Sequence, residues 1–259
     1  MVGIGAPAWV VGEWEKCCFA GMGRLAYNKK DIMTFIFIFQ LIVLIFSAVI
    51  HEVSHGYVAQ ALGDPTAEQA GRLTLNPLKH LDPFGSVILP LLLSLIPGGI
   101  IFGWAKPVPY NPNNLKDPKK GGALIAAAGP ASNFLIAIAF SVFCALLPIA
   151  TSMKRAISGM FVTGDLTSAT PLLSNPVSML YFLFLIVVLI NIVLGVFNLV
   201  PIPPLDGSKV LFGFLPVDLH RFEAFFGQFG FVILILFIFF GWGVIAPIIN
   251  VLFHVLVGG

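Results

Sequence analysis

Long apolar blocks separated by shorter polar segments dominate this chain. Four of the blocks carry very few charged residues: Thr34 to about Leu62, Gly122–Ile149, Ser178–Val200 and Phe229–Leu256. Each exceeds the roughly 20 residues that a helix needs to cross the hydrocarbon core of a bilayer. The pattern therefore predicts about four full transmembrane helices, with a kink at Pro247 in the last one.

The segments between the blocks predict smaller features. Gly71–Leu75 alternates apolar and polar residues with the period of a strand, which predicts a small membrane-associated β element with an edge that a substrate could pair with. Residues 104–122, rich in proline, asparagine and lysine, predict an interfacial loop, and residues 150–177 predict a polar loop.

Composition supports an integral membrane protein. Of the 259 residues, 58% are hydrophobic and only 10% are charged, and the mean hydropathy is +0.98. A soluble domain of this length could not hide that much apolar surface, so the lipid bilayer is the expected environment. The net charge of +2 is too small to indicate nucleic-acid binding. Cys17, Cys18 and Cys144 provide neither a disulfide framework nor a cysteine-rich zinc site.

The chain shows no long internal repeat and no low-complexity linker, so residues 34–259 are expected to form a single membrane-embedded domain. Residues 1–33 mix short apolar pieces with basic residues and lack the pattern of a signal peptide. They are interpreted either as a peripheral amphipathic arm or as sequence upstream of a start at Met22 or Met33.

The first apolar block contains the sequence HEVSH, an instance of the H-E-x-x-H motif. Residues four apart share one face of a helix, so His51 and His55 could both direct ring nitrogens at one metal ion. Glu52, rotated away from them, could accept a proton from a water on that metal, as in zinc hydrolases. The alternative is a set of satisfied polar groups in a helical bundle, but ionisable groups at membrane depth cost roughly 2–3 kcal/mol each and persist mainly where they function.

A catalytic zinc ion usually takes three protein ligands, so one more is expected. Asp206 is the strongest candidate, because it follows an apolar span and lies in a proline-rich break that could turn a carboxylate inward. The alternative is an ordinary aspartate in a turn. His220 and His254 are weaker candidates, one in a polar connection and the other near the end of the last block.

If Asp206 joins His51 and His55, the first and third spans must run parallel, because both motifs lie near the C-terminal ends of their helices. Gly122–Ile149 then supplies the single crossing between them. Ser86–Trp104, interrupted by two prolines and a pair of glycines, must enter and leave on the same side, which predicts a re-entrant hairpin. The expected fold is an all-α polytopic membrane protein with this hairpin and the small β element.

The distribution of basic residues indicates the orientation. Eight of the fourteen lie in the loops on the side of the expected metal site: Arg72, Lys79, Lys106, Lys116, Lys119, Lys120, Lys209 and Arg221. The positive-inside rule therefore places the site near the cytoplasmic face of the cell membrane, although Lys29 and Lys30 favour the opposite orientation.

Several motifs in order resemble the site-2 protease family of intramembrane zinc metalloproteases, most closely its compact prokaryotic branch. The resemblance covers about residues 35–215 and includes HEVSHG (51–56), GDPT (63–66), GRLTLNPLKHLDP (71–83), GWAKPVP (103–109), GPASN (129–133) and FNLVPIPPLDG (197–207). No appended PDZ-like or CBS-like domain is visible.

The resemblance implies one catalytic Zn²⁺ bound by His51, His55 and Asp206, with Glu52 as the catalytic base. It also implies a role for Asn133 near the reacting carbonyl, with Asn198 as a second candidate; a helix–helix hydrogen bond is an equal alternative for Asn133. The implied reaction is hydrolysis of peptide bonds in or near transmembrane segments of membrane-protein substrates, as in regulated intramembrane proteolysis.

Two other function classes compete with a protease. A metal transporter or sensor would also use buried histidine and aspartate, but it needs no proton acceptor beside the ligands, so Glu52 argues against it. A zinc hydrolase acting on lipids or on other amides would carry the same residues, and the sequence leaves that alternative open.

Overall fold

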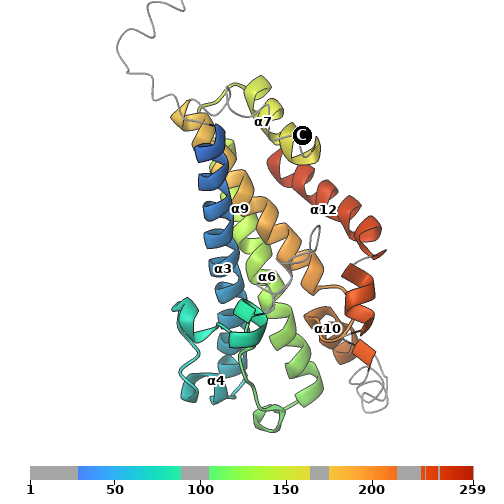
Figure 1. Cartoon of the computed structure of the whole chain (residues 1–259). Coiled ribbons are helices and arrows are strands. Elements are labelled where there is room, and N and C mark those ends of the chain that lie inside the picture. The colour runs from blue at the N-terminus through green and yellow to red at the C-terminus, as the bar shows by residue number, and fades with distance from the viewer. Residues whose placement is uncertain are drawn as a thin grey trace, which may run out of the picture. The chain divides into compact units, whose positions relative to one another are not determined.

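The computed structural model describes residues 29–88, 105–163, 175–214, 229–230, 232–238 and 240–258. Within these residues, three helices are long and apolar enough to cross a membrane: α3 (Lys29–Ala61), α6 (Pro118–Leu146) and α9 (Pro176–Asn198) (Figure 1). A fourth candidate combines Val232–Ile238 with α12 (Trp242–Val257). The prediction of a helical polytopic membrane protein is thus confirmed, and the contacts described below lie within the compact unit Ile36–Gly259.

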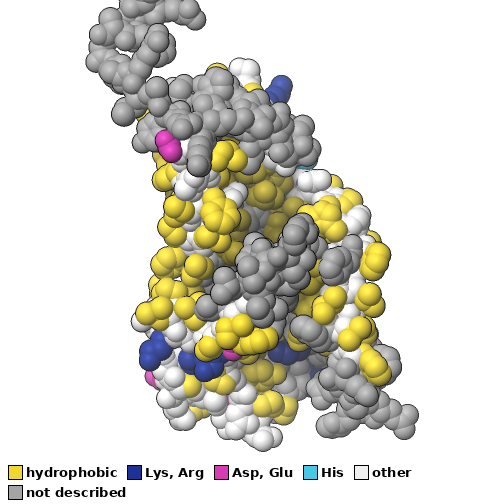
Figure 2. All heavy atoms as spheres, viewed as in Figure 1, with side chains coloured by type: hydrophobic (Ala, Val, Ile, Leu, Met, Phe, Trp, Pro, Cys, Tyr) yellow, Lys and Arg dark blue, Asp and Glu magenta, His cyan; other side chains and the backbone are white. Residues whose placement is uncertain are grey.

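The three long helices differ in how much protein surrounds them. In the most apolar window of α9, 56% of the residues are buried, against 17% in α3. One flank of α3 consists of exposed large apolar side chains, including Phe37, Ile38 and Leu41. Figure 2 shows this broad apolar surface, with Lys and Arg side chains gathered mostly below it. Exposed apolar residues on this scale fit contact with lipid, so α9 is the interior helix and α3 lines the outside.

Helices α6 and α9 start at well-defined caps and pack most extensively against each other. Asp117 accepts hydrogen bonds from the backbone N–H groups of Lys119 and Lys120, and Asn175 accepts one from that of Val177. Each cap is followed by a proline at the first helical position, where its missing N–H costs nothing.

The directions of the spans agree with the sequence prediction. Figure 1 shows α3 and α9 running the same way, with α6 running in the opposite direction beside them. The C-terminal half of α3 and the C-terminal end of α9 therefore lie at the same end of the bundle. That end also carries the short elements α4 (Thr66–Gln69), η1 (Pro77–Lys79), a π-helical turn η2 (Pro83–Ile88) and η3 (Pro112–Asn114).

The structure does not show the predicted β element. Gly71 lies in a turn with φ +62°, and the residues that follow it to Leu75 form no strand. The described residues contain one isolated antiparallel bridge, between Leu81 and Ala105. The reason is that Arg72 buries its side chain and hydrogen-bonds to backbone carbonyls of the 105–111 segment, so a side chain makes the link that strand pairing would make.

Two further predictions need correction. The expected polar loop 150–177 contains a helix, α7 (Thr151–Thr163), whose Lys154 donates to the last carbonyls of α6, at Cys144 and Ala145. In the last apolar block the chain bends by 61° between Ile238 and Trp242, ahead of Pro247, which lies inside α12.

Other predictions fall outside the described residues. Most of the expected re-entrant hairpin does, because residues 89–104 are not described. Residues 1–28 of the N-terminal arm also lie outside, and α3 begins at Lys29, five residues before the predicted start of the first span.

Candidate metal centre

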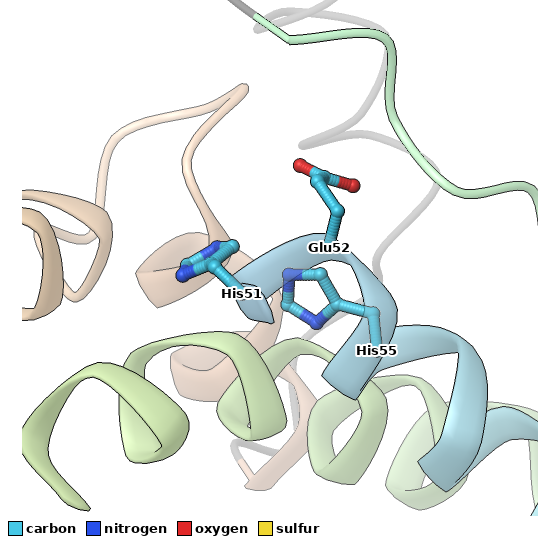
Figure 3. Close-up of side chains that lie close together, drawn as sticks. All are labelled: His51, Glu52 and His55. Atoms are coloured by element: carbon cyan, nitrogen blue, oxygen red, sulfur yellow. The ribbon is translucent and has the colours of Figure 1, made fainter. Parts of the chain in front are cut away.

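His51 and His55 lie one turn apart on α3 and project toward α6, whereas Glu52 projects away from it (Figure 3). Their rings meet edge to face, with centroids 4.7 Å apart and an interplanar angle of 89°. Only 5% of His51 and 9% of His55 is exposed. Each of the three residues offers a ligand atom within 4.8 Å of the others.

The Nδ1 atom of each ring faces a hydrogen-bond acceptor. His55 Nδ1 lies 2.6 Å from the backbone oxygen of Ile125, which can only accept, so this nitrogen donates. His51 Nδ1 lies 2.6 Å from Oδ1 of Asn133. Both Nε2 atoms are then left with lone pairs, which is the state in which imidazole binds a metal.

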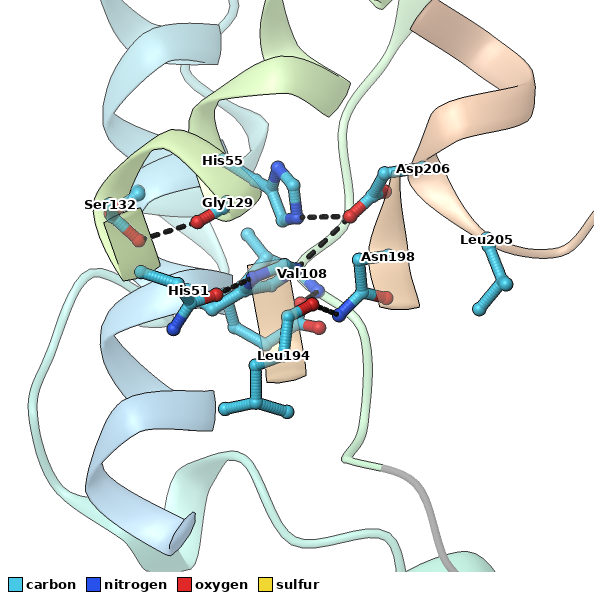
Figure 4. Close-up of polar contacts among 12 residues, drawn as sticks. His51, His55, Val108, Gly129, Ser132, Leu194, Asn198, Leu205 and Asp206 are labelled. Carbon is cyan, nitrogen blue, oxygen red and sulfur yellow. Dashed lines mark hydrogen bonds and ion pairs between the residues drawn. The ribbon is translucent and has the colours of Figure 1, made fainter. Parts of the chain in front are cut away.

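Asp206 completes the cluster from the first residue of α10 (Asp206–Phe214). Its Oδ2 lies 3.0 Å from Nε2 of His51 and 3.2 Å from Nε2 of His55 (Figure 4). The structure thus brings together the three residues that the sequence proposed as ligands.

The spacing of the donor atoms fits zinc. Two ligands at about 2.0–2.1 Å from a tetrahedral ion lie about 3.3 Å apart, close to the separations between Asp206 and each histidine. Two imidazoles and a carboxylate also form the three-ligand set of a catalytic zinc site with a fourth position open.

Gly129 of α6 lies directly against the two rings. A Cβ atom at this position would come within 2.5 Å of Nε2 of both His51 and His55. Any side chain there would occupy the space at which the ring nitrogens converge. The glycine of the GPASN sequence therefore allows α6 to pack close to the ligands.

Glu52 is held on the adjacent face of α3. Its Oε2 accepts a 2.9 Å hydrogen bond from the backbone N–H of Val108, in the irregular segment 105–111. This contact fixes one carboxylate oxygen and leaves Oε1 for proton transfer. Glu52 is half-buried beside the ligands, the position required of a proton acceptor that does not bind the metal itself.

Asp64 fastens the same segment to the end of α3. The side chain is fully buried and accepts hydrogen bonds from Thr66 (backbone and hydroxyl), from the backbone N–H of Asn111 and from the side chain of Asn114. Burial raises the pKa of Asp64, but these donors outweigh burial and lower it below its ordinary value. Asp64 was not among the predicted site residues; an aspartate directly after a helix-ending glycine was the available signal.

Arg72 holds the segment from a second side. Its Nη2 donates to the carbonyl of Lys106 at 2.7 Å and to that of Pro107 at 3.4 Å. The N–H of Lys106 in turn donates to the carbonyl of His80. Arg72 thus holds the two residues before Val108, and with them the N–H that binds the carboxylate of Glu52.

A cavity of about 160 Å³ opens beside these residues. Apart from the ligands and Glu52, its polar lining side chains are Tyr110, Asn198 and Lys209. Lys209 places its Nζ 5.8 Å from the ring centroid of Tyr110. The cavity leaves room for water beside the cluster.

The contacts of Asn133 differ from those of an oxyanion donor. The residue is fully buried, its Oδ1 faces His51, and its Nδ2 donates to Oδ1 of Asn191 at 2.9 Å and to the carbonyl of Ser47 at 3.4 Å. Both ends of the amide are therefore engaged inside the bundle. Asn191 was not among the predicted residues, although an amide in the middle of the most apolar span is a signal that could have found it.

Asn198, the second candidate from the sequence, does line the cavity. Its Nδ2 donates to the carbonyl of Leu194 in its own helix (Figure 4). A rotation of this half-buried side chain would release the amide toward the cavity.

Comparison with known proteins gives the same chemistry. The sequence profile described as Peptidase family M50 matches residues 39–239. This chain belongs to peptidase family M50. The family is that of the site-2 proteases, so the resemblance seen in the sequence is confirmed, and the M50 chain is a zinc metalloprotease.

Relatives of this M50 chain carry matching names. It is 36% identical over 231 residues to the "Putative zinc metalloprotease YwhC" of Bacillus subtilis strain 168, covering 88% of this chain and 92% of the relative. It is 28% identical to the "Putative zinc metalloprotease Rip2" of Mycolicibacterium smegmatis, covering 83% and 74%, respectively. A Mycobacterium tuberculosis protein of the same name is 27% identical, covering 89% and 73%. No solved structure matches the chain.

Replacing Gly129 by alanine should abolish zinc binding. The added methyl group would lie within 2.5 Å of both Nε2 atoms, and the nearest atoms belong to buried rings that cannot move aside. Zinc per chain, measured by plasma emission spectroscopy on protein purified in detergent, should fall at least tenfold. The matched control is Gly159→Ala in α7, where a Cβ meets nothing within 4 Å, and its zinc content should equal that of the wild type. Full zinc occupancy in Gly129→Ala would contradict the assigned packing.

Asp64→Asn should destabilise the fold at neutral pH, because the introduced NH₂ group would face donors from Asn111 and Asn114. The free energy of unfolding in micelles should fall by about 2–3 kcal/mol. Because its pKa is lowered on folding, Asp64 stabilises the protein above the ordinary value of 3.8 and loses this effect as the pH falls through its folded pKa. The difference between wild type and variant should therefore shrink on acidification, while Asp117→Asn, an exposed cap, changes little. A constant difference at all pH values would contradict this account.

Proposed function

We propose that this M50 metalloprotease cleaves peptide bonds in or near transmembrane segments of membrane-protein substrates, the reaction of regulated intramembrane proteolysis. The observation that carries the proposal is the position of the ligands on a membrane-spanning helix. His51 lies ten residues before the end of α3 at Ala61, which corresponds to roughly 15 Å along the helix axis. A substrate bond must reach that depth, so a membrane-embedded substrate is favoured over a soluble one.

In this proposal His51, His55 and Asp206 hold the zinc ion. Bound zinc supplies Lewis acidity for the scissile carbonyl and lowers the pKa of water toward about 7. Glu52, fixed through Oε2 by Val108, uses Oε1 to accept a proton from the attacking water and later delivers it to the leaving amine.

The two asparagines take different roles. Asn133 holds His51, since its amide is engaged on both sides within the bundle. Asn198 lines the cavity and is the better placed of the two to donate to the oxyanion that develops on the substrate carbonyl. In this proposal Asn133 takes the helix–helix hydrogen-bonding role, one of the two alternatives that the sequence left equal.

The proposed orientation places the cavity near the cytoplasmic face. Seven of the eight basic residues predicted on that side are described, and Arg221 lies outside the described residues. Lys209 lies in α10, Lys119 and Lys120 lie in the first turn of α6, Lys79 lies in η1, and the other three lie in the connections between these elements. At the opposite end α7 carries Lys154 and Arg155, and Lys29 and Lys30 begin α3, so seven described basic residues face four. This asymmetry follows the positive-inside rule.

Glu52→Gln should retain zinc and lose proteolysis, because glutamine preserves the shape and an acceptor for Val108 but cannot take up the proton. Cleavage of a membrane-spanning reporter co-expressed with the variant should fall by at least about 100-fold. Glu68→Gln is the matched control, since Glu68 pairs with Gln60 outside the cavity, and it should cleave normally. Reporter cleavage that persists in Glu52→Gln would reject Glu52 as the base, and soluble peptides cleaved in preference to the reporter would reject the substrate class.

Single cysteines should label from opposite sides of the cell membrane. In a background with Cys17, Cys18 and Cys144 replaced by serine, Arg155→Cys should react with an impermeant maleimide in intact cells, because α7 is placed outside. Lys116→Cys, beside the predicted cytoplasmic end of α6, should react only after permeabilisation. The reverse pattern of labelling would invert the proposed topology.

A further inference from the structure

A chain of buried polar side chains leads from His51 to the interior helix α9. It consists of Asn133 of α6, Asn191 of α9 and Ser47 of α3, each almost completely buried. The proposed chemistry uses neither Asn191 nor Ser47. Isolated amides in an apolar bundle are costly unless every hydrogen bond is made. The order of donors and acceptors along this row of side chains therefore determines which way each amide is turned.

The orientation of the Asn191 amide is fixed by its own helix. Its Nδ2 lies 2.9 Å from the carbonyl of Val187 and 3.0 Å from Oγ of Ser47. Because the Val187 carbonyl can only accept, the nitrogen must be on this side. Oδ1 of Asn191 therefore faces Asn133.

The orientation of the Asn191 amide determines the orientation of the Asn133 amide. Facing an oxygen, Asn133 must present Nδ2 to Asn191, and the carbonyl of Ser47 offers a second acceptor on the same side. Oδ1 of Asn133 is then directed at His51 and can only accept. The hydrogen on His51 consequently resides on Nδ1, and the Nε2 lone pair points toward Asp206.

The two histidines differ in this respect. His55 is oriented by the backbone carbonyl of Ile125, which no substitution can reverse. The acceptor for His51 is an amide that could rotate by 180° and would then present NH₂ to the ring. The 2.9 Å hydrogen bond to Asn191, together with the longer contact to the carbonyl of Ser47 at 3.4 Å, opposes that rotation.

We infer that Asn191 is a positioning residue for the metal centre: through Asn133 it holds His51 in the tautomer and orientation that bind zinc. This inference rests on the proposed ligand set of His51, His55 and Asp206. It assigns to α9 a contribution to the site besides leading into the turn that precedes Asp206.

The test measures zinc affinity by competition with a chromophoric chelator, on full-length protein in detergent. Asn133→Leu should weaken zinc binding 10- to 100-fold, and Asn191→Leu, of similar volume but without hydrogen bonds, should weaken it about tenfold. Asn191→Asp keeps an acceptor facing Asn133 and should stay within about threefold of wild type. The double variant should bind no more weakly than Asn133→Leu alone, because Asn191 acts through that residue.

Controls separate positioning from stability. Ile192→Ala shortens a fully buried apolar side chain of the same helix, which has no polar atom to hydrogen-bond with Asn133, so it should lower thermal stability without changing zinc affinity. If Asn191→Leu does not accumulate, Asn191→Ala gives the same comparison. Equal losses of zinc affinity in the Asp and Leu variants, additive losses in the double variant, or an equal loss in Ile192→Ala would overturn the inference.

The same experiment distinguishes failure of the inference from failure of the proposed function. Asp206→Ala removes a proposed ligand and should lose zinc altogether. Wild-type affinity in Asp206→Ala would reject the ligand set itself. If Asp206→Ala and Asn133→Leu lose affinity but Asn191→Leu does not, the metal centre stands and only the role of Asn191 is rejected.

Discussion

Placing ionisable groups inside an apolar bundle is the constraint on which this structure depends. A charged or unpaired polar group at membrane depth costs several kcal/mol, and a buried pair is tolerable only when the remaining hydrogen bonds are made. The histidines have Asn133 and Ile125 as hydrogen-bond partners and Glu52 has Val108, while Asp206 lies within 3.2 Å of both Nε2 atoms, where a bound metal ion would join the three. The surrounding helices are arranged so that these partners converge at one depth.

The partners can converge at one depth only if the helix backbones come close together, and this explains why glycine occupies positions 129 and 207. Gly129 lets α6 touch the two rings. Gly207, directly after Asp206, lies so close to the end of α9 that a Cβ there would come within 2.1 Å of the Leu199 carbonyl oxygen. The chain can therefore fold back sharply after α9, and this turn directs Asp206 toward α3 rather than past it.

Sequence could predict the features that depend on one helix or on its direction. The spacing of His51 and His55 sets a common face, and the need for a third ligand set the parallel course of α3 and α9. It could not predict contacts made by lone polar residues, such as Asp64, Arg72 and Asn191, because no period or motif links them to their partners. The strand predicted for Gly71–Leu75 failed for the same reason: alternation does not reveal that Arg72 turns inward to bind carbonyls of another segment.

The centre thus has two parts that are held independently. The ligands are fixed by helix-to-helix contacts among α3, α6 and α10, whereas Glu52 on the adjacent face of α3 is fixed by the 105–111 segment, which Asp64 and Arg72 anchor. A change in the segment would move the proton acceptor while the donor atoms for zinc stay in place. The contacts that hold the donor atoms for zinc and those that hold the proton acceptor are therefore separate in this fold.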